Sequence, residues 1–316
     1  MKNIVLFTLA LLSFSKVFAQ QEPLFSQYNS NAFLINPAVA GSKDNHSINL
    51  FHRWQWVTFP GAPITFGLTY QGKIGKVHGL GALLFADITG PSMRIGFKGS
   101  YAFHIPFKNN LTLSVGVAAR IVRNSININT ITFRNNNDIA IANATEAVYG
   151  GDAELGLFLY HPKFWVGFSA PNLIQTKIDF GANPANRDPL GMGYRHYFLN
   201  GGYKFQIPGK DIILEPSVMV KYVQGPYPQV DGGLTVRLLK DQIAFGVFYR
   251  NPSFISIQSK FLFDNSIPLL LSFDFSTAPF QNYSIGATEV MLGYDFIKNV
   301  DPLPVETPET NENTRF

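Results

Sequence analysis

The chain has 316 residues, of which 46% are hydrophobic and only 15% are charged, and its formal net charge is +4. It contains no cysteine, which excludes a disulfide scaffold, a cysteine-ligated metal site, a cysteine nucleophile and a lipid-modified cysteine. The mild positive charge is compatible with contact with anionic lipid headgroups. No nucleic-acid-binding motif accompanies it, so we expect no nucleic-acid partner.

The first 19 residues have the pattern of a secretory signal peptide. Lys2 supplies a positive charge, residues 4–12 form a short apolar run, and Ala19 ends a cleavage site. An uncut membrane anchor is the alternative, but the apolar run is too short to span a bilayer. No later apolar run approaches 18 residues, so no transmembrane helix is expected. We predict an exported chain from which residues 1–19 are removed.

Residues 20–46 are polar and Pro-containing with no clear period, and we expect an irregular N-terminal segment there. Residues 93–105 then alternate, with Met93 and Phe97 in odd positions and Arg94 and Lys98 in even ones. Such alternation separates two faces of a strand but mixes them on a helix. It recurs in about 14 segments, so we predict an all-β fold over residues 47–296 and a disordered periplasmic tail over residues 297–316. The predicted strands cover residues 48–57, 64–71, 79–88, 93–105, 111–121, 152–161, 163–170, 194–206, 211–222, 229–238, 242–250, 254–263, 267–276 and 284–296.

The connections between these strands decide what the apolar faces contact. Every second connection is short, and the two long polar segments, 122–150 and 171–193, both fall in the other set. Short turns at one end and long loops at the other are typical of outer-membrane β-barrels with antiparallel strands. A soluble β-sandwich would show the same alternation but has no reason to sort its loops in this way. The pattern therefore favours a transmembrane barrel with both termini on the periplasmic side.

In such a barrel the polar faces line the lumen. Charges of both signs occur there, which argues against a strongly ion-selective pore. Two interpretations remain open: an interior network of ion pairs that stiffens the barrel, or a lumen that holds a plug or a polypeptide partner. The lumenal charged residues expected are Arg53, Arg94, Lys98, Arg120, Asp152, Glu154, Lys204, Glu215, Lys221, Asp231, Arg237, Lys260 and Asp274.

No pattern of catalytic chemistry stands out. The six histidines show no metal-ligand spacing, and Gly72–Lys73 lacks the rest of a phosphate-binding loop. Asp152 and Glu154 share a face as a hydrolytic pair might, but an interior ion-pair network accounts for them better. The Asn/Asp run at residues 135–138 could hold calcium, although a solvated loop is the more common role. We expect no catalytic residues, no metal, no cofactor and no enzymatic activity.

Several short motifs are more distinctive than the alternation. The mature start contains Phe25-Ser26-Gln27-Tyr28 and Asn36-Pro37-Ala38-Val39-Ala40-Gly41. Arg53-Trp54-Gln55-Trp56 and Gly61-Ala62-Pro63 follow, then Asp87-Ile88-Thr89-Gly90-Pro91 and Gly167-Phe168-Ser169-Ala170-Pro171-Asn172-Leu173. Together they resemble the PorP/SprF family of type IX secretion system outer-membrane proteins over nearly the whole mature chain. Asp295 before the closing Phe296 and the tail beyond it depart from the family pattern.

The resemblance implies an outer-membrane barrel, exposed at the cell surface, that docks or anchors secreted cargo such as gliding-motility adhesins. It implies as partners cargo with a C-terminal targeting domain and periplasmic or peptidoglycan-linked secretion components, besides outer-membrane lipid. The motif residues expected to be structural or to contact partners are Asn36, Pro37, Gly41, Arg53, Gln55, Trp56, Gly61, Pro63, Asp87, Gly90 and Pro91. The alternative function is an outer-membrane channel for passive or ligand-specific uptake of small, hydrophobic compounds.

Position along the first strand adds detail to these motifs. Arg53 and Gln55 share the polar face and should point into the lumen near its outer end, whereas Trp56 should lie on the lipid face. We further hypothesise that the N-terminal segment enters from the periplasm. Residues 36–41 would then fold into or under the lumen, where Arg53 could bond their freed backbone carbonyls.

Overall fold

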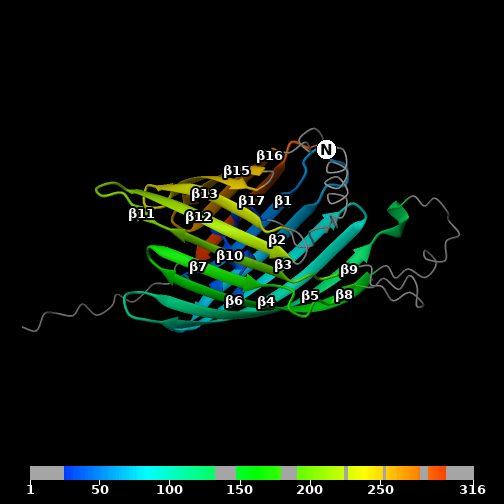
Figure 1. Ribbon diagram of the computed structural model, residues 1–316, viewed down its shortest axis with the longest axis horizontal. Coiled ribbons are helices and arrows are strands. Elements are labelled where there is room, and N and C mark those ends of the chain that lie inside the picture. Colours follow the sequence, from blue (N-terminus) through cyan, green and yellow to red (C-terminus); the bar gives the residue numbers. More distant parts are fainter. Residues whose placement is uncertain are drawn as a thin grey trace, which may run out of the picture.

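A computed structural model describes residues 25–131, 147–178, 191–223, 227–251, 254–277 and 284–296. The predicted leader (1–19), the start of the N-terminal segment and the predicted tail (297–316) lie outside the described residues, as does the run at 135–138. The described chain forms one closed antiparallel barrel, because β1 pairs with β17 in the register His46↔Phe296 (Figure 1).

Fourteen strands make up the barrel wall among the described residues, when β10 and the two-residue β11 are counted as one interrupted strand. The prediction of an all-β barrel with about 14 antiparallel strands is confirmed. The strands are β1 (His46–Trp54), β2 (Ile64–Ile74), β3 (His78–Thr89), β4 (Ser92–Pro106), β5 (Thr112–Ile126), β6 (Ala147–His161), β7 (Phe164–Ala170), β10 (His196–Tyr203) with β11 (Phe205–Gln206), β12 (Ile212–Val223), β13 (Gln229–Leu238), β14 (Ile243–Arg250), β15 (Phe254–Phe263), β16 (Ile267–Ser276) and β17 (Ala287–Phe296).

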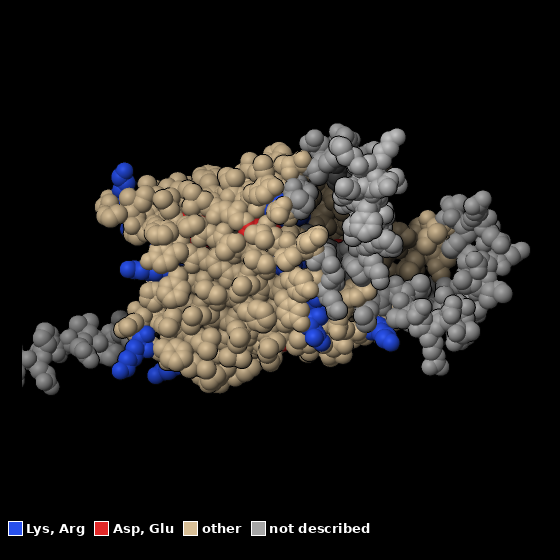
Figure 2. Space-filling model, viewed as in Figure 1, with Lys and Arg blue, Asp and Glu red and all other residues tan. Residues whose placement is uncertain are grey.

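The two faces of the wall follow the alternation in the sequence. In β4, the Phe97 side chain points outward and is 48% exposed, while its neighbour Lys98 points inward and is 2% exposed. On the face seen in Figure 2, the outward surface between the two ends of the barrel carries almost no charge, and Lys and Arg side chains gather at its ends. This distribution is the one expected for an apolar belt in contact with lipid.

Some strand ends differ from the prediction. The ladder between β5 and β6 continues to the pair Ser125↔Ala147, so the connection spans residues 127–146 and not 122–150. The first strand ends earlier than expected, at Trp54, because Trp56 has a φ of +52° and breaks the extended backbone.

The connections sort into two ends. Six short turns (75–77, 107–111, 162–163, 207–211, 239–242 and 264–266) lie at one end, called here the short-turn end, at the left of Figure 1. The longest connections, 127–146 and 171–195, lie at the other, the long-loop end, where η4 (Ile128–Thr130) and the small hairpin of β8 (Lys177–Ile178) and β9 (Gly191–Met192) also lie. No helix in the described part of the chain is long and apolar enough to cross a membrane.

Residues 25–44, called here the N-terminal segment, pack inside the barrel. They form three short 3-10 helices: η1 (Gln27–Asn29), η2 (Ala32–Leu34) and η3 (Pro37–Val39). Phe33, Ala38 and Ala40 are fully buried and belong to one apolar cluster with inward side chains of the wall, including Phe51 and Met291. The hydrophobic core of the molecule therefore lies between the wall and its own N-terminal segment.

Candidate functional site

The N-terminal segment rests in a groove of small inward-facing residues. Gly79, Ala102, Gly116, Gly156 and Ser169 pair directly across neighbouring strands, so that they form one row from β3 to β7. Because these residues have small side chains or none, the wall lies closer to the backbone of η3 than larger residues would allow. The row is the seat of η3.

Glycine is required at these positions by direct contact. A Cβ atom on Gly116 would overlap the backbone of Ala38, and one on Gly79 would overlap the carbonyl of Ala40. A Cβ atom on Gly81 would overlap the Phe33 ring. The wall is therefore complementary in shape to the segment and not a smooth tube beside it.

Asn36 connects the segment to two strands. Its Nδ2 donates to the carbonyl oxygens of Leu157 (3.0 Å) and Phe168 (3.2 Å), in β6 and β7. Its Oδ1 accepts from the backbone N–H of Ala38 at 3.0 Å and so caps η3, whose first residue is the buried Pro37. This one side chain therefore caps the short helix and ties it to two neighbouring strands of the wall.

The carbonyls of the segment are bound by side chains from the wall. Ser114 Oγ donates to the Ala38 carbonyl at 2.7 Å, and Ser169 Oγ donates to the Ile35 carbonyl at 2.6 Å. Lys98 Nζ donates to the Leu34 carbonyl at 3.3 Å, and a His104 ring nitrogen lies 2.9 Å from the Ala40 carbonyl. These groups do what the sequence-based hypothesis gave to Arg53.

Arg53 instead binds carboxylates, so that part of the hypothesis is wrong. Its Nη2 lies 2.9 Å from Asp274 and its Nη1 lies 2.8 Å from Glu289. Ser26 completes the cluster: its Oγ donates to Asp274 at 2.6 Å and its backbone N–H donates to Glu289 at 2.9 Å. A buried guanidinium needs such carboxylates, because neutral carbonyls leave its charge uncompensated.

Glu289 was missed by the sequence analysis. It lies on the inward face of β17 together with Met291. The alternation of inward and outward residues along this strand could have placed Glu289 in the lumen from the sequence. Several of the other lumenal charges form ion pairs, which for these residues confirms the ion-pair interpretation alongside a lumen that holds a segment. The pairs are Lys98–Glu154 at 3.1 Å, Arg250–Asp231 at 2.8 Å, Arg237–Glu215 at 2.6 Å and Lys260–Asp241 at 2.7 Å.

The segment runs from the long-loop half of the lumen toward the short-turn end. Ser26 lies beside Arg53, near the long-loop end of β1, whereas Asp44 pairs with Lys73 at 2.9 Å at the opposite end. Gly41, with a φ of +72°, turns the chain out of the lumen at that end, close to Gly79. This direction is opposite to the hypothesised entry from the short-turn end.

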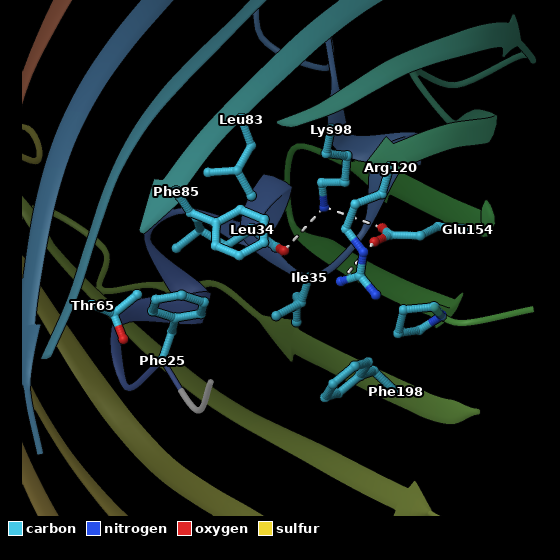
Figure 3. Close-up of a pocket in the computed structure, with 11 residues that line it drawn as sticks. Phe25, Leu34, Ile35, Thr65, Leu83, Phe85, Lys98, Arg120, Glu154 and Phe198 are labelled. Atoms are coloured by element: carbon cyan, nitrogen blue, oxygen red, sulfur yellow. Dashed lines mark hydrogen bonds and ion pairs between the residues drawn. The ribbon is translucent and has the colours of Figure 1, made fainter. Parts of the chain in front are cut away.

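Two cavities flank the segment. One of about 50 Å³ faces the long-loop side; Phe25, Leu34 and Phe85 line it, with Lys98 and Glu154 at its edge (Figure 3). The other, of about 230 Å³, faces the short-turn side and is lined by polar and charged groups, including Lys43, Arg237, Asp241, Lys260 and Asp295. The segment separates the two.

The remaining motif residues meet at the long-loop end. The carbonyl of Gly61 (φ +72°) accepts from the N–H of Gly90 (φ +54°) at 3.0 Å, which joins the first two loops. Thr65 Oγ1 donates to Asp87 at 2.7 Å, and the Pro91 carbonyl accepts from Asn127 N–H at 2.8 Å. These residues fasten the rim of the barrel and do not contact the segment's seat.

Gln55, Trp56 and Pro63 belong to the same rim. The N–H of Gln55 donates to the carbonyl of the buried Pro63 at 2.9 Å, and the Gln55 side chain is half-buried. Trp56 is 38% exposed and stacks edge-on against Phe59, with ring centroids 6.4 Å apart. The structure thus brings Asn36, Pro37 and Gly41 to the seat, Arg53 to the Ser26 cluster, and the other motif residues to the rim.

The segment 167–173 connects the seat to the rim. Ser169 binds the N-terminal segment, while Asn172 contacts Arg120 and donates to the Tyr194 carbonyl at 3.0 Å. Asp152 accepts from the N–H of Ile174 at 2.9 Å. Asp152 and Glu154 therefore have separate structural partners. Within the described ranges, no group of His, Cys, Asp and Glu side chains is arranged to hold a metal ion.

The family model for the type IX secretion system membrane protein PorP/SprF matches residues 17–294. This chain belongs to the PorP/SprF family. The resemblance drawn from the sequence motifs is confirmed, and with it an outer-membrane location and a role in type IX secretion. In outer-membrane barrels the short turns face the periplasm, and on that ground we assign the short-turn end to the periplasmic side. Comparison with curated proteins gave no match.

Solved structures show the same fold at low identity. The monoaromatic hydrocarbon channel CymD is 13% identical, with a TM-score of 0.54, over 89% of this chain and 95% of that one. The toluene transporter TbuX of Ralstonia pickettii is 11% identical, with a TM-score of 0.52, over 84% and 92%. A mutant of the monoaromatic hydrocarbon channel TodX is 10% identical, with a TM-score of 0.50, over 85% and 94%.

Proposed function

We propose that this PorP/SprF protein is a docking or anchoring component, which holds secreted cargo at the outer membrane and does not conduct small solutes. Its partners would be cargo with a C-terminal targeting domain, such as a gliding adhesin, and periplasmic or peptidoglycan-linked parts of the secretion machinery. Catalysis forms no part of the proposal. Export would begin with removal of residues 1–19.

The observation that supports this proposal is the N-terminal segment in the lumen. It is fixed along its length, by Ser26 at the Arg53 cluster, by Asn36 at β6 and β7, and by Ala40 at His104. The wall carries glycines where the segment passes. A barrel whose own chain is fitted into its lumen is suited to present a rigid surface to a partner.

The channel alternative receives less support. The apolar cavity on the long-loop side measures about 50 Å³, whereas a cavity that binds benzene measures about 150 Å³. The cavity on the short-turn side is larger, about 230 Å³, but polar and charged groups line it, which does not suit a hydrophobic solute. The hydrocarbon channels that share the fold are at most 13% identical to this chain, so they speak for its architecture alone.

A flux measurement separates the two functions. The purified full-length protein is reconstituted into liposomes, and swelling in small sugars and uptake of toluene are compared with those of protein-free liposomes. Docking predicts rates close to the protein-free control. Fast flux of either solute through the wild-type barrel would contradict the proposal and support a channel.

A further inference from the structure

Five of the six short turns carry a lysine. The residues are Lys76, Lys108, Lys163, Lys210 and Lys240, and all five are exposed. Their ammonium groups make no hydrogen bond or ion pair with any described residue. Lysines in the lumen are different, since Lys98 and Lys260 are each paired with a carboxylate.

These lysines stand on the rim and not in the lumen. In Figure 2, Lys and Arg side chains project from the left-hand, short-turn end, beyond an outer wall that is almost free of charge. Because each lysine belongs to a different turn, the charges are spread around much of the circumference of the barrel. The rim charges therefore lie where the apolar belt gives way to lipid headgroups.

Exposed apolar side chains stand next to two of the lysines. Phe107 beside Lys108 is 52% exposed, and Leu239 beside Lys240 is 56% exposed. A turn that pairs an outward apolar side chain with a lysine matches the boundary between acyl chains and headgroups, where long lysine stems extend their charge to the phosphates. An acidic protein partner would not need these apolar neighbours.

The turn conformation does not explain these residues. Leu239 and Lys240 have φ values of +51° and +55°, which glycine or asparagine adopts more readily. Unpaired acidic charge in the described part of this rim is limited to the exposed Asp211 and Asp264. Asp44 is paired with Lys73, and Asp241, beside Lys240, is paired with Arg237 and Lys260. Leu239 and Lys240 are therefore explained better by a contact outside the protein than by the geometry of their own turn.

We propose that these five lysines form a ring that binds anionic phosphate headgroups of lipids in the periplasmic leaflet of the outer membrane. The ring fixes the depth of the barrel and surrounds its periplasmic face with anionic lipid. The gap in the ring lies at the sixth turn, 264–266, which carries Asp264.

Electron spin resonance with spin-labelled lipids tests the ring. The full-length protein is reconstituted in phosphatidylcholine with a trace of spin-labelled phosphatidylglycerol or phosphatidylcholine, and the fraction of motionally restricted probe gives the relative association constants. The wild type should prefer phosphatidylglycerol, and added salt should reduce the preference. The variant with all five lysines changed to Gln should lose it, with about fivefold in affinity expected for each direct lysine–phosphate contact.

A second variant, with the same five lysines changed to Arg, keeps the charge and should retain the preference. Heat-modifiable gel migration checks that both variants are folded. Equal restriction of the two probes by the wild type would overturn the proposal, as would a preference that persists in the Gln variant. If the Gln variant keeps the lipid preference but no longer co-isolates a periplasmic protein that the wild type retains, the ring binds a protein partner instead.

Discussion

Arg53 in β1 and Asp274 in β16 meet in the lumen, with Nη2 and Oδ2 2.9 Å apart and both side chains almost fully buried. Ser26 binds the same carboxylate through its hydroxyl. The pair therefore links two strands of the wall to the start of the N-terminal segment. Arg53, a residue of the family motif, therefore helps to hold the N-terminal segment inside the barrel.

Replacing Arg53 with Met should destabilise the barrel by about 3–5 kcal/mol, because Glu289 would remain buried without its cation. Asp274 would keep only the longer contact with Arg250, at 3.8 Å. The free energy of unfolding in urea, followed by loss of heat-modifiable migration, measures the effect. Lys73→Met is the matched control, since its ion pair with the exposed Asp44 should contribute no more than about 1 kcal/mol. Similar losses in the two variants would contradict the role given to Arg53.

Gly116→Leu should displace η3 from its seat, because a Cβ atom at this position already overlaps the Ala38 backbone. Overpacking of this kind costs about 1–3 kcal/mol, and we expect conductance in planar bilayers to rise as the segment leaves the lumen. Gly99→Ala in the neighbouring strand is the control. Its Cβ would face outward, with the nearest atom, in the Phe97 ring, 3.5 Å away. Unchanged conductance in a folded Gly116→Leu barrel would show that the segment does not block the lumen.

Phe97→Arg should cost about 2–4 kcal/mol if residue 97 lies near the bilayer midplane, because its side chain points to lipid. The same change at Phe107, in a short turn at the membrane boundary, should cost about 0–1 kcal/mol. Unfolding in lipid vesicles gives both values. Assembly of Phe97→Arg with wild-type stability would mean that the outward face of β4 is not in the apolar belt.

Asn36→Ala should loosen the segment without changing the wall. It removes the cap of η3 and two hydrogen bonds to strand carbonyls, each worth about 0.5–1.5 kcal/mol. We expect faster proteolysis between residues 25 and 44, while the barrel itself resists. Asn251→Ala, at an exposed position without a positive φ, serves as the control. Equal protease resistance of wild type and Asn36→Ala would argue against the anchoring role of Asn36.

The strands could be predicted from the sequence because lipid on one side and a polar lumen on the other impose strict alternation. β13, β15 and β16 have the predicted bounds, and Lys98 and Phe97 face as expected. The ends of β1 and β5 could not be predicted, since they depend on a positive φ at Trp56 and on pairing with β6.

The contacts inside the lumen were harder to predict from the sequence than the strands. Arg53 finds its carboxylates more than 200 residues away, and nothing near it in the chain identifies them. The seat of η3 also escaped, although glycines in the inward phase of consecutive strands, such as Gly79, Gly116 and Gly156, were a visible signal. A glycine in that phase leaves space that the rest of the chain has to fill.

Affinity isolation from the producing cells tests the docking proposal most directly. The tagged full-length barrel is cross-linked in intact cells, isolated, and its partners are quantified by mass spectrometry against another outer-membrane barrel from the same cells. We predict enrichment of a secreted protein with a C-terminal targeting domain, cross-linked to this chain, together with type IX secretion components. Enrichment of the secretion components without any such cargo, or of neither, would contradict the proposal that this barrel docks cargo at the cell surface.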